Sequence, residues 1–245
     1  MNFLHEVFVW FNDPLNWQGT NGIAHRLLEH MALALGALLI ACVIAVPAGL
    51  LLGRSRRKGS VAVNVANVGR AIPSFAILAL GVIWIGIGYR PALIALVLLA
   101  LPPIFVFTFT AVRQVDPATV EAARGMGMTE ASVLRKVQLP IALPLMLDGI
   151  RLSAAAVIAT TTLAALVGWG GLGRYIVDGF AVRDFVQVFG GVVLVAGMVL
   201  VSEAIFTLLL RFAVSPGIRR QRAPRRRQRR RDRPTAGVAE RVVGA

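Results

Sequence analysis

The sequence predicts an all-α protein that crosses a membrane about five times, with a helical loop on one side. Apolar residues make up 57% of the 245 residues and charged residues only 16%, and the mean hydropathy is +0.72. Four uncharged runs, and a fifth interrupted only by Glu203, are long enough to cross a bilayer, which takes roughly 20 helical residues. The predicted spans lie near residues 31–53, 71–89, 91–112, 152–173 and 185–210.

The Lys and Arg residues predict on which side each loop lies, because cytoplasmic loops are enriched in them. The basic segment 54–58 directly follows the first predicted span. Five more basic residues follow the third span: Arg113, Arg124, Arg135, Lys136 and Arg151. We therefore expect one membrane domain over residues 31–214, with the N-terminus outside and the C-terminus in the cytoplasm.

The two ends of the chain differ from this membrane domain. Residues 1–30 carry an apolar face followed by the turn-rich Asn12-Asp13-Pro14, and we expect an external helix that lies on the outer leaflet or packs against the spans. Residues 215–245 are rich in Arg and Pro and are expected to form a largely disordered cytoplasmic tail. Beside a span, such a basic run favours membrane lipid. RNA is the alternative, but no aromatic residue after Phe212 could stack on a base, so no nucleic acid is expected.

Few residues suggest enzyme chemistry. The sequence has no G-x-x-x-x-G-K-[ST] phosphate loop, so this chain is not expected to bind or hydrolyse ATP. His5, His25 and His30 precede the first predicted span and lack the spacing of a zinc site, so they are interpreted as interfacial residues. Cys42, the single cysteine, is interpreted as a small apolar residue within a span. We predict no catalytic residue, no metal and no cofactor on this chain.

The polar stretch 116–140, between the third and fourth spans, has a defined local pattern. Asp116-Pro117 is a helix-opening pair, since the carboxylate can cap free N–H groups and proline needs no N–H in the first turn. The helix that follows contains Glu121, Ala122 and Ala123. The two small alanines would let a partner surface approach this helix closely.

The second half of this stretch predicts a turn and another helix. Gly127 permits a sharp turn that a residue with a Cβ would resist. Thr129 can cap a second helix, and Glu130 favours its positive end. Pro140, preceded by Leu139, is expected to end that helix. The stretch therefore predicts a helix–turn–helix that docks onto another protein, rather than an ordinary amphipathic loop.

Some residues in the spans are candidates for a translocation pathway or a gate. Hydroxyl side chains and glycines allow helices to approach closely and to form hydrogen bonds, so structural packing is the alternative role. Glu203 is an ionisable residue within a predicted span, which either reaches the cytoplasmic interface, pairs with Arg211 or serves transport. The candidates are Pro73, Ser74, Thr160, Thr161, Thr162, Gly170, Gly171 and Glu203.

The order Glu121-Ala122-Ala123, Gly127 and Val137-Gln138-Leu139-Pro140 resembles the cytoplasmic "EAA" loop of binding-protein-dependent ABC importer permeases. The segments 70–75, 121–128 and 162–176 look like the osmoprotectant branch of that family, which carries glycine betaine, choline or carnitine. The resemblance covers roughly residues 30–212. It implies a type I importer-like permease in a bacterial cytoplasmic membrane.

The resemblance also implies partners. These are a cytoplasmic ABC ATPase dimer that holds ATP and Mg²⁺, an extracytoplasmic solute-binding protein, and a second permease subunit, either a paralogue, which we favour, or an identical copy. Carried over to this chain, it implies that Glu121, Ala122, Ala123 and Gly127 contact the ATPase, and that Leu139 and Pro140 fix the exit of the loop. A methionine-type importer permease is the alternative within transport. A membrane scaffold whose basic tail recruits a partner is the alternative outside it.

Overall fold

The computed structural model describes residues 2–54, 63–64 and 73–213, and within these ranges every regular element is a helix. The all-α prediction is therefore confirmed. The expected tail 215–245 lies outside the described residues, as do residues 71 and 72 of the second predicted span.

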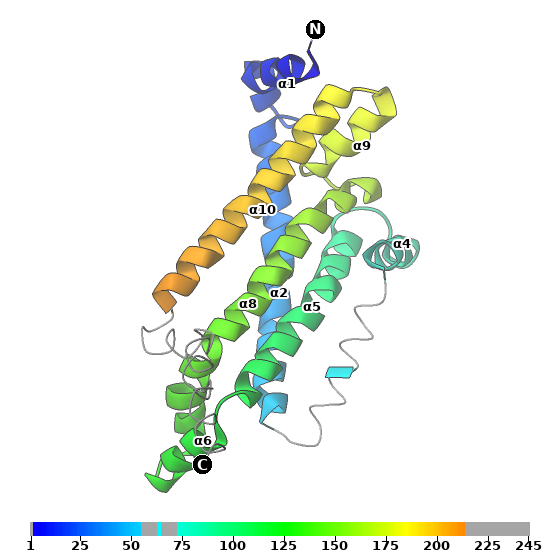
Figure 1. Cartoon of the computed structure of the whole chain (residues 1–245). Helices are drawn as coiled ribbons and strands as arrows, with labels where there is room; N and C mark the ends of the chain where they lie inside the picture. The colour runs from blue at the N-terminus through cyan, green and yellow to red at the C-terminus, as the bar shows by residue number, and fades with distance from the viewer. Residues whose placement is uncertain (1, 55–62, 65–72, 214–245) are drawn as a thin grey trace, which may run out of the picture. The chain divides into compact units, whose positions relative to one another are not determined.

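Four long helical segments run alongside one another in the bundle, with short helices at both ends (Figure 1). α5 packs between α2 and α8, and α10 packs against α8. At one end lie α1 and α9, and at the opposite end lies α6. The elements in order are α1 (Phe3–Asn12), the 3₁₀-helix η1 (Pro14–Trp17), α2 (Ile23–Gly53), α4 (Ser74–Ile85), α5 (Tyr89–Arg113), α6 (Pro117–Gly125), α7 (Glu130–Val133), the π-helix η2 (Leu134–Gln138), α8 (Leu139–Thr160), the 3₁₀-helix η3 (Thr161–Val167), α9 (Gly173–Val182) and α10 (Phe185–Ala213).

Four helical segments of the described chain are long and apolar enough to cross a membrane: 23–53, 89–113, 130–167 and 185–212. The predicted second span corresponds to α4, which has 12 residues. At 1.5 Å per residue it rises about 18 Å, less than the roughly 30 Å of a bilayer core. In the part of the chain that is described, this element is thus shorter than the predicted span.

Small residues explain the close packing of α2 on α5. Ala37, Ala41, Ala45, Gly49 and Gly53 recur every four residues along α2, and all are buried. A Cβ at Gly49 would lie only 2.7 Å from Cβ of a threonine on α5. Because side chains four residues apart share one helix face, this stripe lets the two backbones approach closely.

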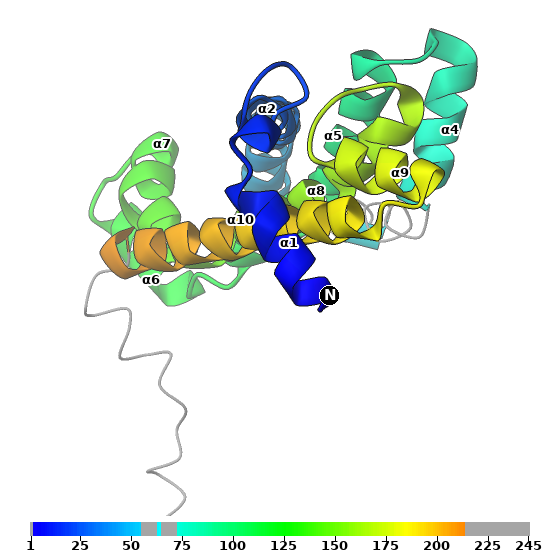
Figure 2. The same ribbon diagram turned by 90° about the horizontal axis from the view of Figure 1, so that it is seen from above.

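The N-terminal helix α1 crosses α10 near the start of that helix (Figure 2). The rings of Phe3 and Phe189 meet edge to face with their centroids 5.5 Å apart, and Trp10 meets Tyr175 in the same way at 5.5 Å. Leu4 and Phe8 remain exposed on the outer side of α1. Of the two alternatives for residues 1–30, packing against the spans is therefore present, and an apolar side is still free for contact with lipid.

Two helix boundaries differ from the predictions. α2 begins at Ile23 rather than at residue 31, so Glu29 and His30 lie inside the first span. The interpretation of His30 as interfacial is wrong, since its side chain is completely buried. The fourth span begins at Leu139 rather than at residue 152, because the helix after the loop continues directly into it.

Candidate functional site

The predicted helix–turn–helix forms, and its caps are the predicted ones. The Asp116 side chain accepts a hydrogen bond from the backbone N–H of Ala118 at 2.9 Å and so caps α6. Gly127 has a φ of 81° and makes the turn. Thr129 Oγ1 accepts from the backbone N–H of Ser132 at 3.3 Å and caps α7. These local signals therefore determine the shape of the module.

The two alanines of the motif face opposite ways. Ala123 is 2% exposed and belongs to a small core with Val115, Val120 and Val133. Ala122 is exposed on α6, and so is Glu121, which lines the cleft described below. Ala122 can therefore meet a partner directly, whereas Ala123 keeps the module compact.

Sequence reasoning missed one apolar residue on the outer surface of this module. Met126 stands at the turn and is 76% exposed. An unbranched thioether side chain adapts to irregular surfaces, which suits a docking contact. Its position between Gly125 and Gly127 was the available signal, because an apolar side chain in a glycine turn has little chance of burial.

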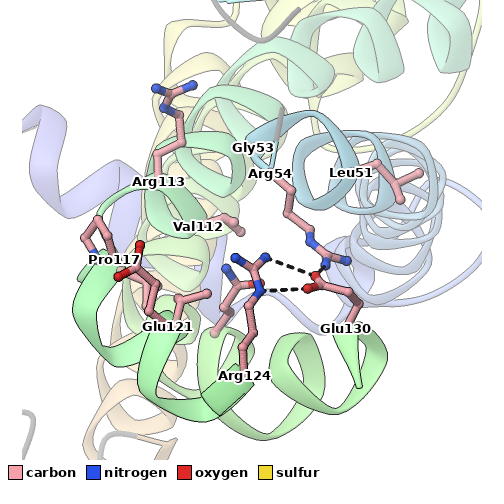
Figure 3. A pocket seen from close by; sticks show the side chains of 12 residues that line it. Leu51, Gly53, Arg54, Val112, Arg113, Pro117, Glu121, Arg124 and Glu130 are labelled. Carbon is pink, nitrogen blue, oxygen red and sulfur yellow. Dashed lines mark hydrogen bonds and ion pairs between the residues drawn. The ribbon is translucent and has the colours of Figure 1, made fainter. Parts of the chain in front are cut away.

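Glu130 connects three helices through ion pairs, which the sequence did not predict. Its carboxylate accepts a 2.7 Å hydrogen bond from Nε of Arg124 on α6. It also pairs with Arg54, the residue that directly follows α2 (Figure 3). The hydrogen bond and the charge of Glu130 raise the pKa of Arg124 above its usual range. The helix–turn–helix is thus tied to the end of the first span.

A cleft of about 920 Å³ lies between this module and the ends of α2 and α5 (Figure 3). Its charged lining groups are Arg54, Arg113, Glu121, Arg124 and Glu130. Gln138 also lines it, and the buried Oε1 of that residue has no hydrogen-bond partner among the described residues. The cleft is therefore a polar opening at the end of the bundle that carries α6.

Pro140 does not end the second helix of the loop, which corrects that prediction. α7 continues through the π-helix Leu134–Gln138 into α8, and Pro140 stands in the first turn of α8. A proline normally clashes with the carbonyl four residues earlier. The wider π-helical winding just before Pro140 accommodates its ring. Leu139 and Pro140 therefore join the loop to the fourth span.

Five of the predicted pathway residues lie at the start of α4 and at the junction of α8 with η3. Pro73 directly precedes α4 and makes no side-chain capping bond, and Ser74 shares a small crevice of about 10 Å³ with Thr160. The Thr161 hydroxyl donates to the carbonyl of Val157 at 2.7 Å, within its own helix. Thr162 does the same with Ala159 at 2.8 Å. These two hydroxyls therefore satisfy helix carbonyls.

Glu203 pairs with a residue that was not considered. Arg151 of α8 donates a hydrogen bond to Oε2 of Glu203 on α10, and both side chains are about one-third exposed. The suggested pairing with Arg211 is wrong. The ion pair links the fourth and fifth predicted spans and neutralises two charges in the apolar bundle.

Gly170 and Gly171 meet the first span at the opposite end of the bundle. The backbone N–H of Gly171 donates to Oε2 of Glu29 at 2.8 Å. Next to Glu29, Nε2 of His30 lies 2.9 Å from the carbonyl oxygen of Ile158. Sequence reasoning missed both α2 residues because it began the span at residue 31. A carboxylate and a histidine within an apolar helical run were the available signal.

A bundle of apolar spans with a protruding helix–turn–helix defines an integral membrane protein. The chain belongs to the family "Binding-protein-dependent transport system inner membrane component", which matches residues 45–220. It is thus a transporter component, and the predicted family is confirmed.

Curated relatives cover most of the chain. The carnitine transport permease protein OpuCB of Listeria monocytogenes is 40% identical over 183 residues, 73% of this chain and 84% of the relative. The choline transport system permease protein OpuBB of Bacillus subtilis (strain 168) is 34% identical, over 82% of this chain and 94% of the relative. The osmoprotectant import permease protein OsmY of Salmonella typhimurium is 36% identical, over 74% of this chain and 75% of the relative.

Solved structures share the fold. An inward-facing conformation of the MetNI methionine ABC transporter aligns with a TM-score of 0.67 at 24% identity, covering 77% of this chain and 94% of that one. An amino acid ABC transporter with histidines aligns with a TM-score of 0.60 at 22% identity, covering 86% of this chain and 97% of that one. At these identities the likeness establishes the permease fold and does not bear on the solute.

Proposed function

We propose that this chain is the permease subunit of an ATP-driven importer that carries a quaternary ammonium osmoprotectant, such as glycine betaine, choline or carnitine, into the cytoplasm. The observation that supports the solute class most directly is the set of relatives. Those that are 34% to 40% identical over about three-quarters or more of this chain carry osmoprotectants, carnitine or choline by name. The methionine transporter is similar at the level of the fold alone.

The docking module supplies the coupling in this proposal. A separate cytoplasmic ATPase would bind the exposed parts of α6 and the turn, where Glu121, Ala122 and Met126 are accessible. Rotation of the module would reach the spans along two routes. One is the continuous helix from α7 into α8, and the other is the ion pair from Glu130 to the end of α2.

The positions of the basic residues support the proposed orientation. Arg54, Arg113 and Arg124 line one cleft at the end of the bundle that carries α6, which supports a cytoplasmic position for this end. The N-terminal helix α1 and the Gly168–Gly173 loop would then face outward, where a solute-binding protein delivers its cargo. A second permease subunit would complete the pathway, and we favour a paralogue over an identical copy.

Uptake of labelled glycine betaine at high osmolarity tests this function, with labelled methionine as a parallel substrate. Cells that lack the gene should lose betaine uptake and recover it when the gene is restored, while methionine uptake stays constant. Loss of methionine uptake alone would assign the chain to the methionine branch. If neither changes, the importer proposal for these solutes fails, and deletion of residues 224–233 would then test a recruiting role for the basic tail.

A further inference from the structure

The fourth span changes its winding before it reaches the outer loop. α8 ends at Thr160, and the chain continues as the 3₁₀-helix η3 to Val167 and then into Gly168, which has a φ of 78°. A 3₁₀ stretch within a long helical span often marks a hinge. Gly171, with a φ of 87°, completes a second bend. We call residues 158–171 the hinge segment.

His30 holds the start of the hinge segment. Its Nε2 lies 2.9 Å from the carbonyl oxygen of Ile158, and the side chain is fully buried. Because a carbonyl only accepts hydrogen bonds, Nε2 of His30 carries a proton and donates it to this bond. In a 3₁₀-helix each N–H group bonds to the carbonyl three residues back, whereas in an α-helix it bonds to the one four residues back. Where α8 changes into η3, the carbonyl of Ile158 therefore needs a donor from outside the helix. His30 supplies that donor.

Glu29 holds the end of the hinge segment. Its Oε2 accepts the backbone N–H of Gly171 at 2.8 Å and the guanidinium of Arg26 at 2.8 Å. The carboxylate lies directly against Gly170, and the three atoms nearest to a Cβ at that position would all belong to Glu29. An alanine at residue 170 would therefore displace the carboxylate and little else.

We propose that Glu29 and His30 form a two-point clamp that positions the hinge segment on α2 and keeps the outer end of the pathway closed. Opening toward the outside then requires release of Gly171 from Glu29. Arg26 would still neutralise the Glu29 carboxylate after Gly171 is released. The open state, in which Glu29 no longer binds Gly171, therefore does not leave an unpaired charge. The clamp rests on the proposed import function for its role, but its geometry can be tested without any solute.

The first test compares uptake in single and double variants. Glu29→Ala removes the acceptor, and Gly170→Ala pushes it away. Without the contact the outer end of the pathway no longer stays closed when the cycle requires it, so each variant should lower betaine uptake about tenfold, the equivalent of a lost charge-assisted hydrogen bond. Glu29→Ala with Gly170→Ala should be no worse than either single variant, because both remove one interaction. Gly197→Ala, on a part of α10 where a Cβ meets no atom within 4 Å, is the matched control.

The second test measures the opening itself. Cys42 is the single cysteine, so Cys42→Ala with Leu172→Cys gives one thiol at a position that is 0% exposed in the closed state. A membrane-impermeant maleimide should label it about tenfold faster in Glu29→Ala or Gly170→Ala backgrounds. Glu29→Gln, which keeps an oxygen acceptor, should label more slowly than Glu29→Ala. Gly197→Ala should not change the rate.

Additive defects in the double variant, or equal labelling rates in all backgrounds, would overturn the clamp. Absence of betaine uptake in the unmodified strain would instead count against the proposed function, while the labelling rates would still decide on the clamp. Thermal unfolding of each variant in detergent separates loss of the fold from loss of the clamp, and Gly170→Ala serves where Glu29→Ala does not fold.

Discussion

Arg54, which directly follows α2, forms an ion pair with Glu130 at the start of α7, 76 residues later in the chain. The same helix carries Glu29 and His30 near its other end, where they contact Gly171 and Ile158. α2 therefore touches both the docking module and the hinge segment. At a rise of 1.5 Å per residue, Glu29 and Arg54 lie about 38 Å apart along this helix.

The ion pair predicts a defect in transport without a defect in folding. Exposed ion pairs contribute less than about 1 kcal/mol to stability. Glu130→Gln should therefore leave the unfolding free energy nearly unchanged and lower uptake about two- to fivefold, because the module loses its link to α2. The control is Glu6→Gln, a carboxylate on the exposed part of α1. Unchanged uptake would show that this link carries no coupling.

The opposite orientations of Ala122 and Ala123 predict two different defects. Ala123→Leu overfills the small core of the module and should lower the unfolding free energy by about 1–3 kcal/mol. Ala122→Leu adds bulk on the exposed side, so stability should stay within about 0.5 kcal/mol. Co-purification with the ATPase should nevertheless fail for Ala122→Leu. Retained assembly in that variant would place the docking surface elsewhere.

Two neighbouring glycines provide a matched pair for the turn. Gly127→Val puts a β-branched residue at a φ of 81°, where such residues rarely occur, and should abolish assembly and uptake. Gly125 ends α6 with no atom within 4 Å of a Cβ, so Gly125→Ala should keep both. The measurement is co-purification of the ATPase, followed by betaine uptake. Equal behaviour of the two variants would rule out a specific role of the turn.

The Arg151–Glu203 pair predicts an asymmetric response. Glu203→Leu removes the ion-pair partner of Arg151 among apolar helices and should cost about 1–3 kcal/mol, less than a fully buried pair because both side chains are one-third exposed. Arg151→Met with Glu203→Leu removes both charges and should recover most of that loss. Thermal unfolding of both variants measures it. A double variant less stable than the single one would contradict this prediction.

Tyr175 predicts a dependence on alkaline pH. Partial burial raises the pKa of Tyr175 to about 12, and its hydroxyl donates to the carbonyl of Asn21 at 2.6 Å. The ordinary value in an unfolded chain is about 10. The contribution of Tyr175 to stability is therefore fully present below about pH 10 and is lost as the pH rises toward 12. With Tyr89→Phe leaving one tyrosine, absorbance at alkaline pH should report this late ionisation, and ionisation near 10 would contradict it.

The sequence allowed the docking module to be predicted because its determinants are local. Capping by Asp116 and Thr129 and the positive φ of Gly127 depend on neighbours a few residues away. Pro140 was misjudged, since a π-helix that tolerates a proline has no simple sequence signal. The class of fold followed from the length of the apolar runs alone.

The clamp and the ion pairs could not be predicted from the sequence, because their partners lie far apart in the chain. Glu29 meets Gly171 across 142 residues, His30 meets Ile158 across 128, and Arg151 meets Glu203 across 52. Hydropathy also predicts a start of the first span at residue 31, which leaves Glu29 and His30 outside it. Polar residues near the end of an apolar run indicate a span boundary by hydropathy, but in the structure the helix continues past Glu29 and His30, and the His30 side chain is buried.

ATP-dependent transport in proteoliposomes tests the central claim most directly. The permease is reconstituted with its ATPase and binding protein, and accumulation of labelled glycine betaine is measured with the native chain and with Gly127→Val. We expect accumulation that requires ATP and the binding protein and that disappears in Gly127→Val but not in Gly125→Ala. Accumulation that does not need ATP, or that persists in Gly127→Val, would contradict it.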